Sequence, residues 1–567
     1  MHQPSIEPRH SVYYDYKVYP YIRPPELDGK KKKHQVALVG AGPIGMVAAL
    51  ELAKQGVSSV LLESERQVSL GSRAICFTRR SMEILQQVGV DKPLLDTGLP
   101  WRYGNSYFRG QRTFRLDMPY DEDDRFGPMI NHQQQYLEQF LVEAIGKQPL
   151  IDLRWGHRVT EIARNDASGA TLRVDTEDGV YDLDADWVVA TDGAGSPVRG
   201  MLGLRMQGDA YEGRFVIADI KVDLDLPTER LAFFDPPWNP GNTVLMHKEP
   251  NGIWRVDFQL PPGETPEEAK AMASLAPRID AQLELATGKK GLKWELDWCS
   301  VYSARAMTLT DYREGRILLS GDAGHMLPIF GVRGANTGWQ DCQNLAWKLA
   351  LVIKGAASER LLRSYSEERV GAAWEIIEEA SKSTRFMTPP SHGYRLLRDA
   401  VLSLSLTQEF VRPLYHWRTS RPHEYLDSSL NAADDDNARF ARGPRNGAQL
   451  DNIKLGANDY LLDHAGQQFQ LICFGSSLAA DVLAETRARK AAGLPLQVIA
   501  VTPASGGPAK VEGADLTLRD ASGHFQAKYG VTEGAAYLAR PDQHVCARWL
   551  KADGKRLAAA FKTALAQ

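Results

Sequence analysis

The sequence predicts an α/β protein organised around a Rossmann-like fold, and three segments carry that prediction. An apolar strand runs into Gly40-x-Gly42-x-x-Gly45 and then into a helix rich in alanine and leucine. Two further apolar strands end in glycine-bearing turns at Asp192 and Asp322, and each turn leads into a helix. In open α/β sheets such strand ends meet at one edge, where ligands bind. Together the three turns can enclose one long dinucleotide.

The first turn has the spacing of a dinucleotide-binding fingerprint. Gly40 allows the tight turn, Gly42 lets a pyrophosphate approach the backbone, and Gly45 lets the helix pack closely on the strand. Pro43 lies within the same turn and is placed with the cofactor-binding residues. The next strand ends in Glu63, at the distance expected for a ribose-binding carboxylate. The fingerprint alone does not choose between FAD and NAD.

The third turn joins a strand, a glycine-rich loop and a helix start in one segment. Its apolar run closes in Gly321-Asp322, which indicates a buried strand that ends in a polar turn. Gly331 and Gly334 let the backbone come close to a flat or phosphorylated ligand. Asn336 is predicted to cap the helix, whose free amino end would attract negative charge. An ordinary strand-turn-helix unit without a ligand is the alternative.

Composition and charge narrow the classes of protein. The chain has 567 residues, 43% hydrophobic and 24% charged, as in soluble enzymes of two to four domains. A formal net charge of -4 gives no basic footprint for nucleic acid. The five cysteines include no Cys-x-x-Cys pair, which disfavours both a disulfide framework and a zinc site. With no apolar signal or membrane-length run, we expect a cytoplasmic protein that binds no metal, membrane or nucleic acid.

Changes in sequence pattern divide the chain into regions. Residues 1–33 are rich in tyrosine and proline and are predicted to form an arm laid over the first domain. Residues 34–208 and 301–430 carry the glycine turns and a helical extension. Residues 209–300, between them, alternate in polarity as a mixed or antiparallel sheet does. A polar, glycine-bearing linker introduces residues 431–567, which contain apolar strands and a final helix.

The inserted sheet is expected to supply the contacts to a substrate. In one of its strands Arg255 and Asp257 share a face, opposite a face of apolar neighbours. Tyr211, His247 and Tyr302 are the other polar candidates. Polar strand faces are often merely solvated, so that alternative stays open for each of these residues.

The ordered turns resemble those of the class A FAD-dependent aromatic hydroxylases, the para-hydroxybenzoate hydroxylase and phenol hydroxylase superfamily. The resemblance is greatest to the 3-(3-hydroxyphenyl)propionate hydroxylase-like branch. It implies a Rossmann-like FAD-binding fold with an inserted mixed β-sheet substrate domain and a thioredoxin-like C-terminal domain. Without a Cys-x-x-Cys pair the last domain cannot exchange dithiols, so we expect it to have a structural or dimer-stabilising role.

The resemblance also implies roles for single residues. Asp322 would hold the FAD ribitol, and the Asp192-Gly193 pair would lie where FAD and the reduced nicotinamide pass. Arg73, which precedes an amphipathic helix, would lie beside the FAD. The alternative for Arg73 is a helix-capping arginine at the surface.

Two further assignments carry alternatives. Gln134 would touch the FAD sugar in a Gln-x-x-x-Glu turn, or the adjacent Gln133 would do so. Arg333 stands where the phenol hydroxylase branch often has a neutral residue. A guanidinium beside the flavin would raise its reduction potential and favour the anionic hydroquinone, whereas one that points to solvent would not.

The reaction implied by the resemblance needs two co-substrates. NADPH or NADH reduces FAD, dioxygen adds to form a C4a-hydroperoxyflavin, and its terminal oxygen is transferred to a phenolic ring. The protein must supply a dry pocket and a group that activates the phenol, so His247, Tyr302 and Arg333 are the catalytic candidates, and Pro328 joins the substrate contacts. No second Gly-x-Gly-x-x-Gly follows a strand, so the nicotinamide cofactor is expected to bind transiently.

Rival functions stay open beside this one. A flavin-dependent oxidoreductase or halogenase could use the same fold, although the Trp-x-Trp-x-Ile-Pro stretch of tryptophan halogenases is absent. A non-catalytic flavin-binding protein could use the C-terminal domain as an interaction module. The expected partners are a small aromatic substrate and dioxygen, and the expected assembly is a homodimer.

Overall fold

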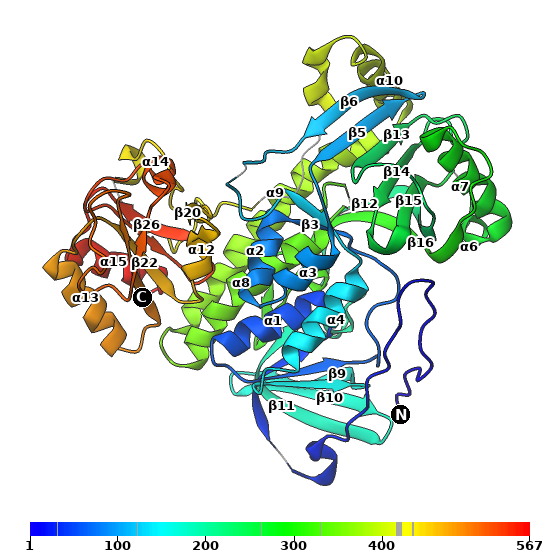
Figure 1. Cartoon of the computed structure of the whole chain (residues 1–567). Helices are drawn as coiled ribbons and strands as arrows, with labels where there is room; N and C mark the ends of the chain where they lie inside the picture. Colours follow the sequence, from blue (N-terminus) through cyan, green and yellow to red (C-terminus); the bar gives the residue numbers. More distant parts are fainter. Residues whose placement is uncertain (31, 122, 262, 329, 416–421, 434–435) are drawn as a thin grey trace.

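Two large mixed sheets and a smaller C-terminal sheet form the framework of the protein (Figure 1). The computed structural model describes the whole chain apart from residues 31, 122, 262, 329, 416–421 and 434–435 and the side chains of residues 211, 212 and 304. No helix in the described part of the chain combines the length and the apolarity needed to cross a bilayer.

The first sheet has eight strands with a parallel core. That core, in the order β18-β11-β1-β2-β8, consists of β1 Lys33–Val39, β2 Ser59–Glu63, β8 Ile151–Trp155, β11 Gly179–Ala190 and β18 Ile317–Leu319. The antiparallel strands β9 Arg158–Asp166, β10 Gly169–Thr176 and β17 Arg313–Glu314 extend it. Consecutive residues of β1 are fully buried, as expected for a parallel strand covered on both faces.

Three helices lie together beside this sheet. The helix α1 Pro43–Lys54 lies between α4 Gln134–Ile145 and α8 Gly334–Ile353 (Figure 1). Their apolar faces join the strands in one core cluster, which contains Met46, Leu141 and Leu345. Because α1 and α8 both begin at the carboxyl edge of the sheet, their amino ends point to the same region.

The second sheet also has eight strands and is mostly antiparallel. Its order is β19-β16-β12-β15-β14-β13-β5-β6, with β5 Tyr103–Phe108, β6 Gln111–Asp117, β12 Gln207–Lys221, β13 Arg230–Phe234, β14 Thr243–Lys248, β15 Ile253–Gln259, β16 Glu295–Thr308 and β19 His325–Met326. Val256 and Phe258 pack against Leu275 and Ile279 of α7 Met272–Thr287. On the opposite face Phe215 and Phe234 pack in a cluster with Phe386 and Val401. Another part of that face lines the cavity described below.

The C-terminal sheet packs on the far end of α8. Its order is β24-β23-β22-β25-β26, with β22 Phe469–Phe474, β23 Leu496–Thr502, β24 Leu516–Arg519, β25 Ala536–Ala539 and β26 Val545–Trp549, flanked by α13 Ala480–Ala491 and α15 Gly554–Ala564. Trp347 of α8 shares a core cluster with Phe469 and Trp549. Glu368 of α9 Arg363–Met387 accepts hydrogen bonds from Arg540 at 2.5 Å and from Lys348 at 2.7 Å.

The predicted fold class is confirmed, with one difference in detail. Strands β5 and β6, from the first region of the chain, belong to the second sheet rather than to the first. The predicted final helix is present, and it follows the antiparallel pair β25–β26. Residues 434–435 of the predicted linker lie outside the described part of the chain. The predicted domain boundaries remain predictions.

Candidate functional site

The carboxyl ends of three parallel strands lie at one level. Val39 of β1 lies opposite Ala190 of β11, and Ala190 lies opposite Leu319 of β18. The three predicted turns therefore start side by side. A cavity of about 980 Å³ opens at these turns and continues beneath the second sheet as far as Tyr302.

The structure brings most of the predicted residues together around this cavity. Those that line it are Gly40, Gly42, Pro43, Glu63, Arg73, Gln134, Asp192, Gly193, Asp322, Gly334 and Asn336, with His247, Arg255, Asp257, Tyr302 and Arg333 beneath the sheet. Gly45, Gly321, Gly331 and Pro328 are described but are not among the lining residues. The side chain of Tyr211 lies outside the described part.

The glycines of the first turn have different physical roles. Gly40 has a φ of +99°, and a Cβ there would come within 2.8 Å of the Thr191 carbonyl oxygen. A Cβ on Gly45 would collide with the Gly40 carbonyl, so this glycine allows the close packing of α1 on β1. Gly42 is the N-cap of α1, and a Cβ there would meet nothing within 4 Å. The amino end of α1 is thus open to the cavity.

Glu63 closes one end of the cavity. Its carboxylate accepts hydrogen bonds from the amides of Ala41 at 2.8 Å and Glu65 at 3.0 Å. Burial raises the pKa of Glu63 above its usual range, while these two bonds act in the opposite direction. Two backbone donors therefore fix the orientation of this carboxylate.

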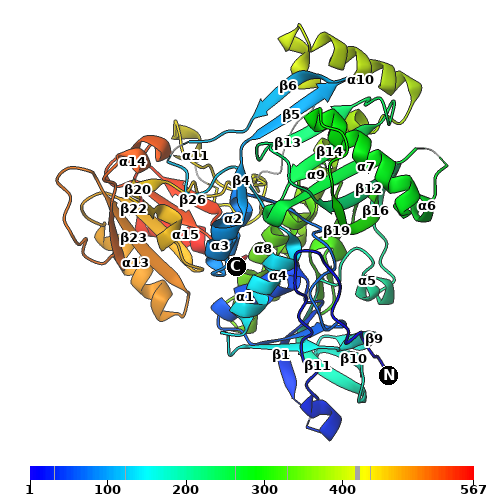
Figure 2. The same cartoon turned by 45° about the vertical axis from the view of Figure 1, so that its right-hand side comes forward.

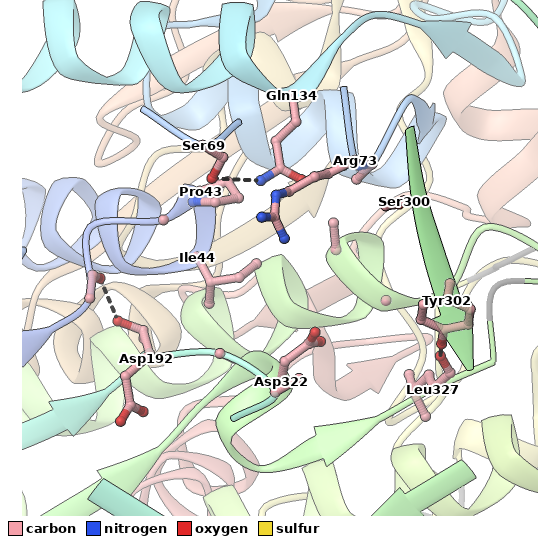
Figure 3. A pocket seen from close by; sticks show the side chains of 18 of the residues that line it. Pro43, Ile44, Ser69, Arg73, Gln134, Asp192, Ser300, Tyr302, Asp322 and Leu327 are labelled. Atoms are coloured by element: carbon pink, nitrogen blue, oxygen red, sulfur yellow. Dashed lines mark hydrogen bonds between the residues drawn. The ribbon is translucent and has the colours of Figure 1, made fainter. Parts of the chain in front are cut away.

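Arg73 and Asp322 reach into the cavity from opposite sides (Figure 3). Arg73 has a φ of +42°, and its Nε donates to the Leu70 carbonyl at 3.2 Å. Asp322 lies in the short 3-10 helix Gly321–Ala323, whose Gly321 amide donates to Asp341 at 3.0 Å. The turn that carries Asp322 is therefore fastened to α8 from behind.

The amide of Gln134 is held by protein groups. Its Oε1 accepts from the Ala74 amide at 3.1 Å, and its Nε2 donates to Glu138 at 2.7 Å (Figure 3 shows its side chain beside Ser69). Gln133 donates to the Pro250 carbonyl at 2.9 Å and is not among the lining residues. Of the two glutamines, only Gln134 lines the cavity.

The Asp192 carboxylate caps a helix. It accepts from the Ser196 hydroxyl at 2.6 Å and from the Val198 amide at 2.9 Å, at the start of α5 Pro197–Met201. In Figure 3 this carboxylate points away from Arg73. The contribution of the Asp192 turn to the cavity therefore comes from its backbone and from Gly193.

The prediction that Asn336 caps α8 is wrong, because the helix begins one residue after Arg333. The Asn336 side chain instead accepts from the Thr78 amide at 3.0 Å and donates to the Cys76 carbonyl at 3.0 Å, both in β3 Cys76–Thr78. Arg333 is only 5% exposed, so it does not point to solvent. Its Nε donates to the Phe330 carbonyl at 3.3 Å.

The polar face of β15 is buried beneath the sheet rather than solvated. Arg255 pairs with Asp219 at 3.0 Å and with Glu249 at 3.6 Å, and it donates to the Arg73 carbonyl at 2.6 Å. These contacts tie the sheet to the Arg73 turn. The charge of Arg255 is therefore balanced within the protein.

Two titratable side chains in this region each have one atom without a hydrogen bond to the described residues. The Asp257 Oδ1 and the His247 Nδ1 are buried without a hydrogen-bond partner among the described residues. Burial raises the pKa of Asp257 to about 7, despite the nearby Arg255. Burial, with Arg230 and Arg255 close by, lowers the pKa of His247 well below its usual value, so its ring is neutral.

Tyr302, on β16 of the second sheet, also lines the cavity. Its hydroxyl donates to the Leu327 carbonyl at 3.3 Å (Figure 3). Burial raises the pKa of Tyr302 to about 12. The phenol group is therefore protonated at neutral pH and is a hydrogen-bond donor.

Several lining residues were not predicted from the sequence. Arg230 opens the otherwise apolar strand β13 and lies buried in the cavity near Asp257. A charged residue at the start of an apolar run is the signal that could have identified it. His2, Ser69 and Trp298 also line the cavity, and no sequence pattern marks them.

Comparison with known families agrees with this geometry. Residues 33–380 match the FAD binding domain family, and residues 453–564 match the HcaD C-terminal domain. The first match covers more than half of the chain, so the chain belongs to the FAD binding domain family. The predicted resemblance to FAD-dependent aromatic hydroxylases and the prediction of FAD are confirmed at this level.

Relatives with known names support the same grouping. The 3-(3-hydroxy-phenyl)propionate/3-hydroxycinnamic acid hydroxylase of Comamonas testosteroni is 29% identical over 380 residues, which cover 67% of this chain and 63% of the relative. The protein of the same name from Mycolicibacterium smegmatis is 29% identical over 370 residues, covering 65% of this chain and 64% of the relative. The chain thus spans less than two thirds of the length of these relatives.

Solved structures show the same fold. The flavin-dependent monooxygenase PieE, in complex with FAD and substrate, superposes with a TM-score of 0.79 at 22% identity and covers 94% of this chain and 99% of that one. Aklavinone-11 hydroxylase, with FAD and aklavinone, gives 0.75 at 24% identity over 94% and 100% of the two chains.

Proposed function

We propose that the protein is an FAD-dependent, NAD(P)H-consuming monooxygenase that hydroxylates a phenolic aromatic substrate. The observation that carries the proposal is one continuous cavity, which joins the glycine turn at the start of α1 to a buried cluster of titratable side chains under the sheet. The relatives named as hydroxylases support the same chemistry.

The cavity fits FAD in several respects. The helices α1 and α8 both begin at the cavity, and neither has a side-chain hydrogen bond at its N-cap. Open helix amino ends favour anionic groups such as a pyrophosphate. We assign the pyrophosphate to Gly42 and Pro43, the ribose to Glu63, and the ribitol to Asp322. Arg73 would then lie beside the cofactor between these two ends.

Bound FAD would accept electrons from NAD(P)H and activate dioxygen, which side chains cannot do. The chain would provide a site that excludes water. Leu245, Leu327 and Val332 also line the cavity and give it apolar surface. Pro328 follows Leu327 in the chain and is buried. We propose that the aromatic substrate binds here, between the second sheet and the start of α8.

Asp257 is our candidate for the group that accepts the phenolic proton. It faces the cavity, and its Oδ1 lacks a hydrogen-bond partner among the described residues. A pKa of about 7 suits a base that works near neutral pH. The neutral His247 and the protonated Tyr302 are better placed as hydrogen-bonding groups for the substrate. Arg255, which is engaged by Asp219, would hold the sheet against the Arg73 turn.

The remaining parts of the proposal concern partners and location. The reduced nicotinamide cofactor would approach near Arg73 and Gly193, and whether it is NADH or NADPH is decided by the assay below. The homodimer rests on the family resemblance. All five cysteines are free, which fits a reducing compartment such as the cytoplasm.

Substrate-stimulated oxidation of the nicotinamide cofactor tests this proposal. The FAD-loaded protein is mixed with NADH or NADPH and each member of a panel of phenols, and products are identified by mass spectrometry. We expect oxidation that rises when a suitable phenol is added, with a product heavier by one oxygen atom. A halide-dependent product would favour a halogenase. FAD binding without any phenol-stimulated oxidation would favour a non-catalytic flavin protein, and either result would overturn the proposal.

A further inference from the structure

The N-terminal arm follows the loop that comes directly after Glu63. This loop, residues 64–71, connects the carboxylate assigned to the ribose with the Arg73 turn. The arm, residues 1–33, lies almost entirely before the segment that matches the FAD binding domain family, which begins at residue 33. In Figures 1 and 2 it is the dark blue chain that winds past α4 and the strands β9 and β10. The arm therefore precedes the matched domain in the chain and lies against its loop of residues 64–71.

The first contact lies at the cavity itself. A nitrogen of the His2 ring lies 2.6 Å from the Ser64 carbonyl oxygen, within hydrogen-bond distance. His2 also lines the cavity, together with Glu63, Ser64 and His157. An arm residue thus forms part of the wall where the adenosine half of FAD is assigned.

Arg9 makes the next contacts along the loop. Its guanidinium donates to the Val68 carbonyl at 2.5 Å and to Glu65 at 3.1 Å. Its backbone amide donates to the Gln67 side chain at 2.8 Å, and that side chain donates back to the Glu7 carbonyl at 2.8 Å. The middle of the loop is therefore bound to the arm by backbone and side-chain groups.

A tyrosine further along the arm holds the loop by a reciprocal pair of bonds. The Tyr19 amide donates to the Arg66 carbonyl at 2.7 Å, and the Arg66 Nε donates to the Tyr19 carbonyl at 2.8 Å. The Tyr19 ring stacks on Trp155 at a centroid distance of 4.4 Å. Tyr14, Tyr16 and Tyr19 form one buried cluster with Val68 and Trp155, so this part of the arm is packed and not a loose tail.

Tyr16 holds the end of the loop that leads to Arg73. Its hydroxyl accepts from the Gly71 amide at 3.0 Å and donates to the Ser69 carbonyl at 3.2 Å. Ser69 in turn donates through its hydroxyl to Glu138 at 2.7 Å, in the helix that carries Gln134. The arm thus reaches the loop at its start, middle and end.

We propose that the arm is the outer wall of the adenosine half of the FAD site, with His2 beside the adenosine and Arg9 and Tyr16 as positioning residues for the loop. The inference rests only on the FAD-binding part of the proposed function and does not depend on the hydroxylation. The affinity for FAD therefore tests it without any turnover.

The test compares four variants of the full chain in the apo form. His2→Ala removes the hydrogen bond to Ser64 at the cavity, and Arg9→Ala removes the two side-chain hydrogen bonds to Val68 and Glu65. Tyr16→Phe removes the hydroxyl that bonds to Gly71 and Ser69 at the end of the loop. Arg23→Ala is the matched control from the same arm, because Arg23 pairs with Asp28 and Asp178 at 3.1 Å, away from the loop. Dissociation constants for FAD, ADP and FMN are measured by fluorescence or calorimetry, and the melting temperature without cofactor checks the fold.

We expect Arg9→Ala and His2→Ala to raise the dissociation constants for FAD and for ADP by about fivefold, as the loss of about one net hydrogen bond implies. Tyr16→Phe should act in the same direction, Arg23→Ala should leave all three constants unchanged, and the FMN constant should stay the same throughout. Because His2 contributes one hydrogen bond at the surface of the cavity, its variant stays informative if Arg9→Ala lowers the melting temperature. FAD and ADP constants for His2→Ala and Tyr16→Phe within twofold of the unmodified protein would overturn the proposal. Weakening of FMN equal to that of ADP would overturn it too.

Discussion

Replacing Asp257 by asparagine tests whether burial under the second sheet raises the pKa of this carboxyl. Burial raises the pKa of this carboxyl from an ordinary value of 3.8 to about 7, so the folded state keeps a proton that the unfolded chain releases. The stability that this proton provides is fully present below pH 3.8 and is lost as the pH rises to about 7. At about 1.4 kcal/mol for each pH unit in that window, the loss amounts to at most about 4 kcal/mol. The titratable groups near Asp257 are Arg255 on its own strand, Asp219 on β12, Arg230 on β13, Glu249 after β14 and Cys76 on β3. The neutral His247 on β14 lies opposite Arg255.

The assay is urea denaturation of both proteins from pH 4 to pH 9, without substrate. Asparagine resembles the protonated carboxyl in shape and carries no titrating proton. The two proteins should therefore be about equally stable at pH 4, and the variant should gain on the unmodified protein as the pH rises to 8. Asp225→Asn, which removes an exposed carboxylate, is the control and should show no such gain. A stability difference for Asp257→Asn that stays constant from pH 4 to pH 9 would refute the reasoning.

Four further substitutions test other parts of the structure. Gly45→Ala places a methyl group against the Gly40 carbonyl and should cost about 1–3 kcal/mol of folding stability, whereas Gly42→Ala, which has open space, should keep the stability and weaken FAD binding. Both are read from urea midpoints and FAD titration, and equal stabilities would contradict the packing argument. Arg333→Gln removes a buried positive charge from the cavity and should lower the flavin reduction potential and slow reduction; an unchanged potential would remove this role. Glu368→Gln removes the carboxylate that pairs with the buried Lys348 and Arg540, while Arg540 keeps its pair with Asp542. The loss should cost about 3–5 kcal/mol by urea denaturation, and a loss below 1 kcal/mol would contradict it.

The backbone parts of the site could be predicted from the sequence because local spacing determines them. Gly40, Gly42 and Gly45 fix a strand, a turn and a helix within a short segment. Gly40 and Gly45 have the close contacts predicted for the turn and for the helix packing, and Gly42 is the N-cap of α1. The convergence of the turns at Asp192 and Asp322 followed from the rule that parallel strand ends meet at one edge.

The side chains under the sheet could not be predicted in the same way. Arg255 and Asp257 were placed on one strand face, but whether that face is solvated or buried depends on what packs against it. Their neighbour Arg230 comes from another strand, and only the register of β13 beside β14 brings it near. Asn336 has the residue type of a helix cap, yet tertiary hydrogen bonds to β3 use its side chain instead.

The N-terminal arm shows the same limit more clearly. Its tyrosines have no periodicity, so the sequence predicted an arm but not its contacts. Tyr16 and Tyr19 bind a loop that lies about fifty residues further along the chain, through hydrogen bonds that only the folded structure reveals.

The central claim is that the three strand ends hold a single extended FAD whose ring lies beneath the second sheet. A crystal structure of the FAD complex tests it most directly. The account predicts the pyrophosphate at Gly42, the ribose at Glu63, and the isoalloxazine ring between Asp322 and the sheet residues Tyr302 and Asp257. A cofactor whose ring lies outside this cavity, or whose pyrophosphate lies away from the start of α1, would contradict it.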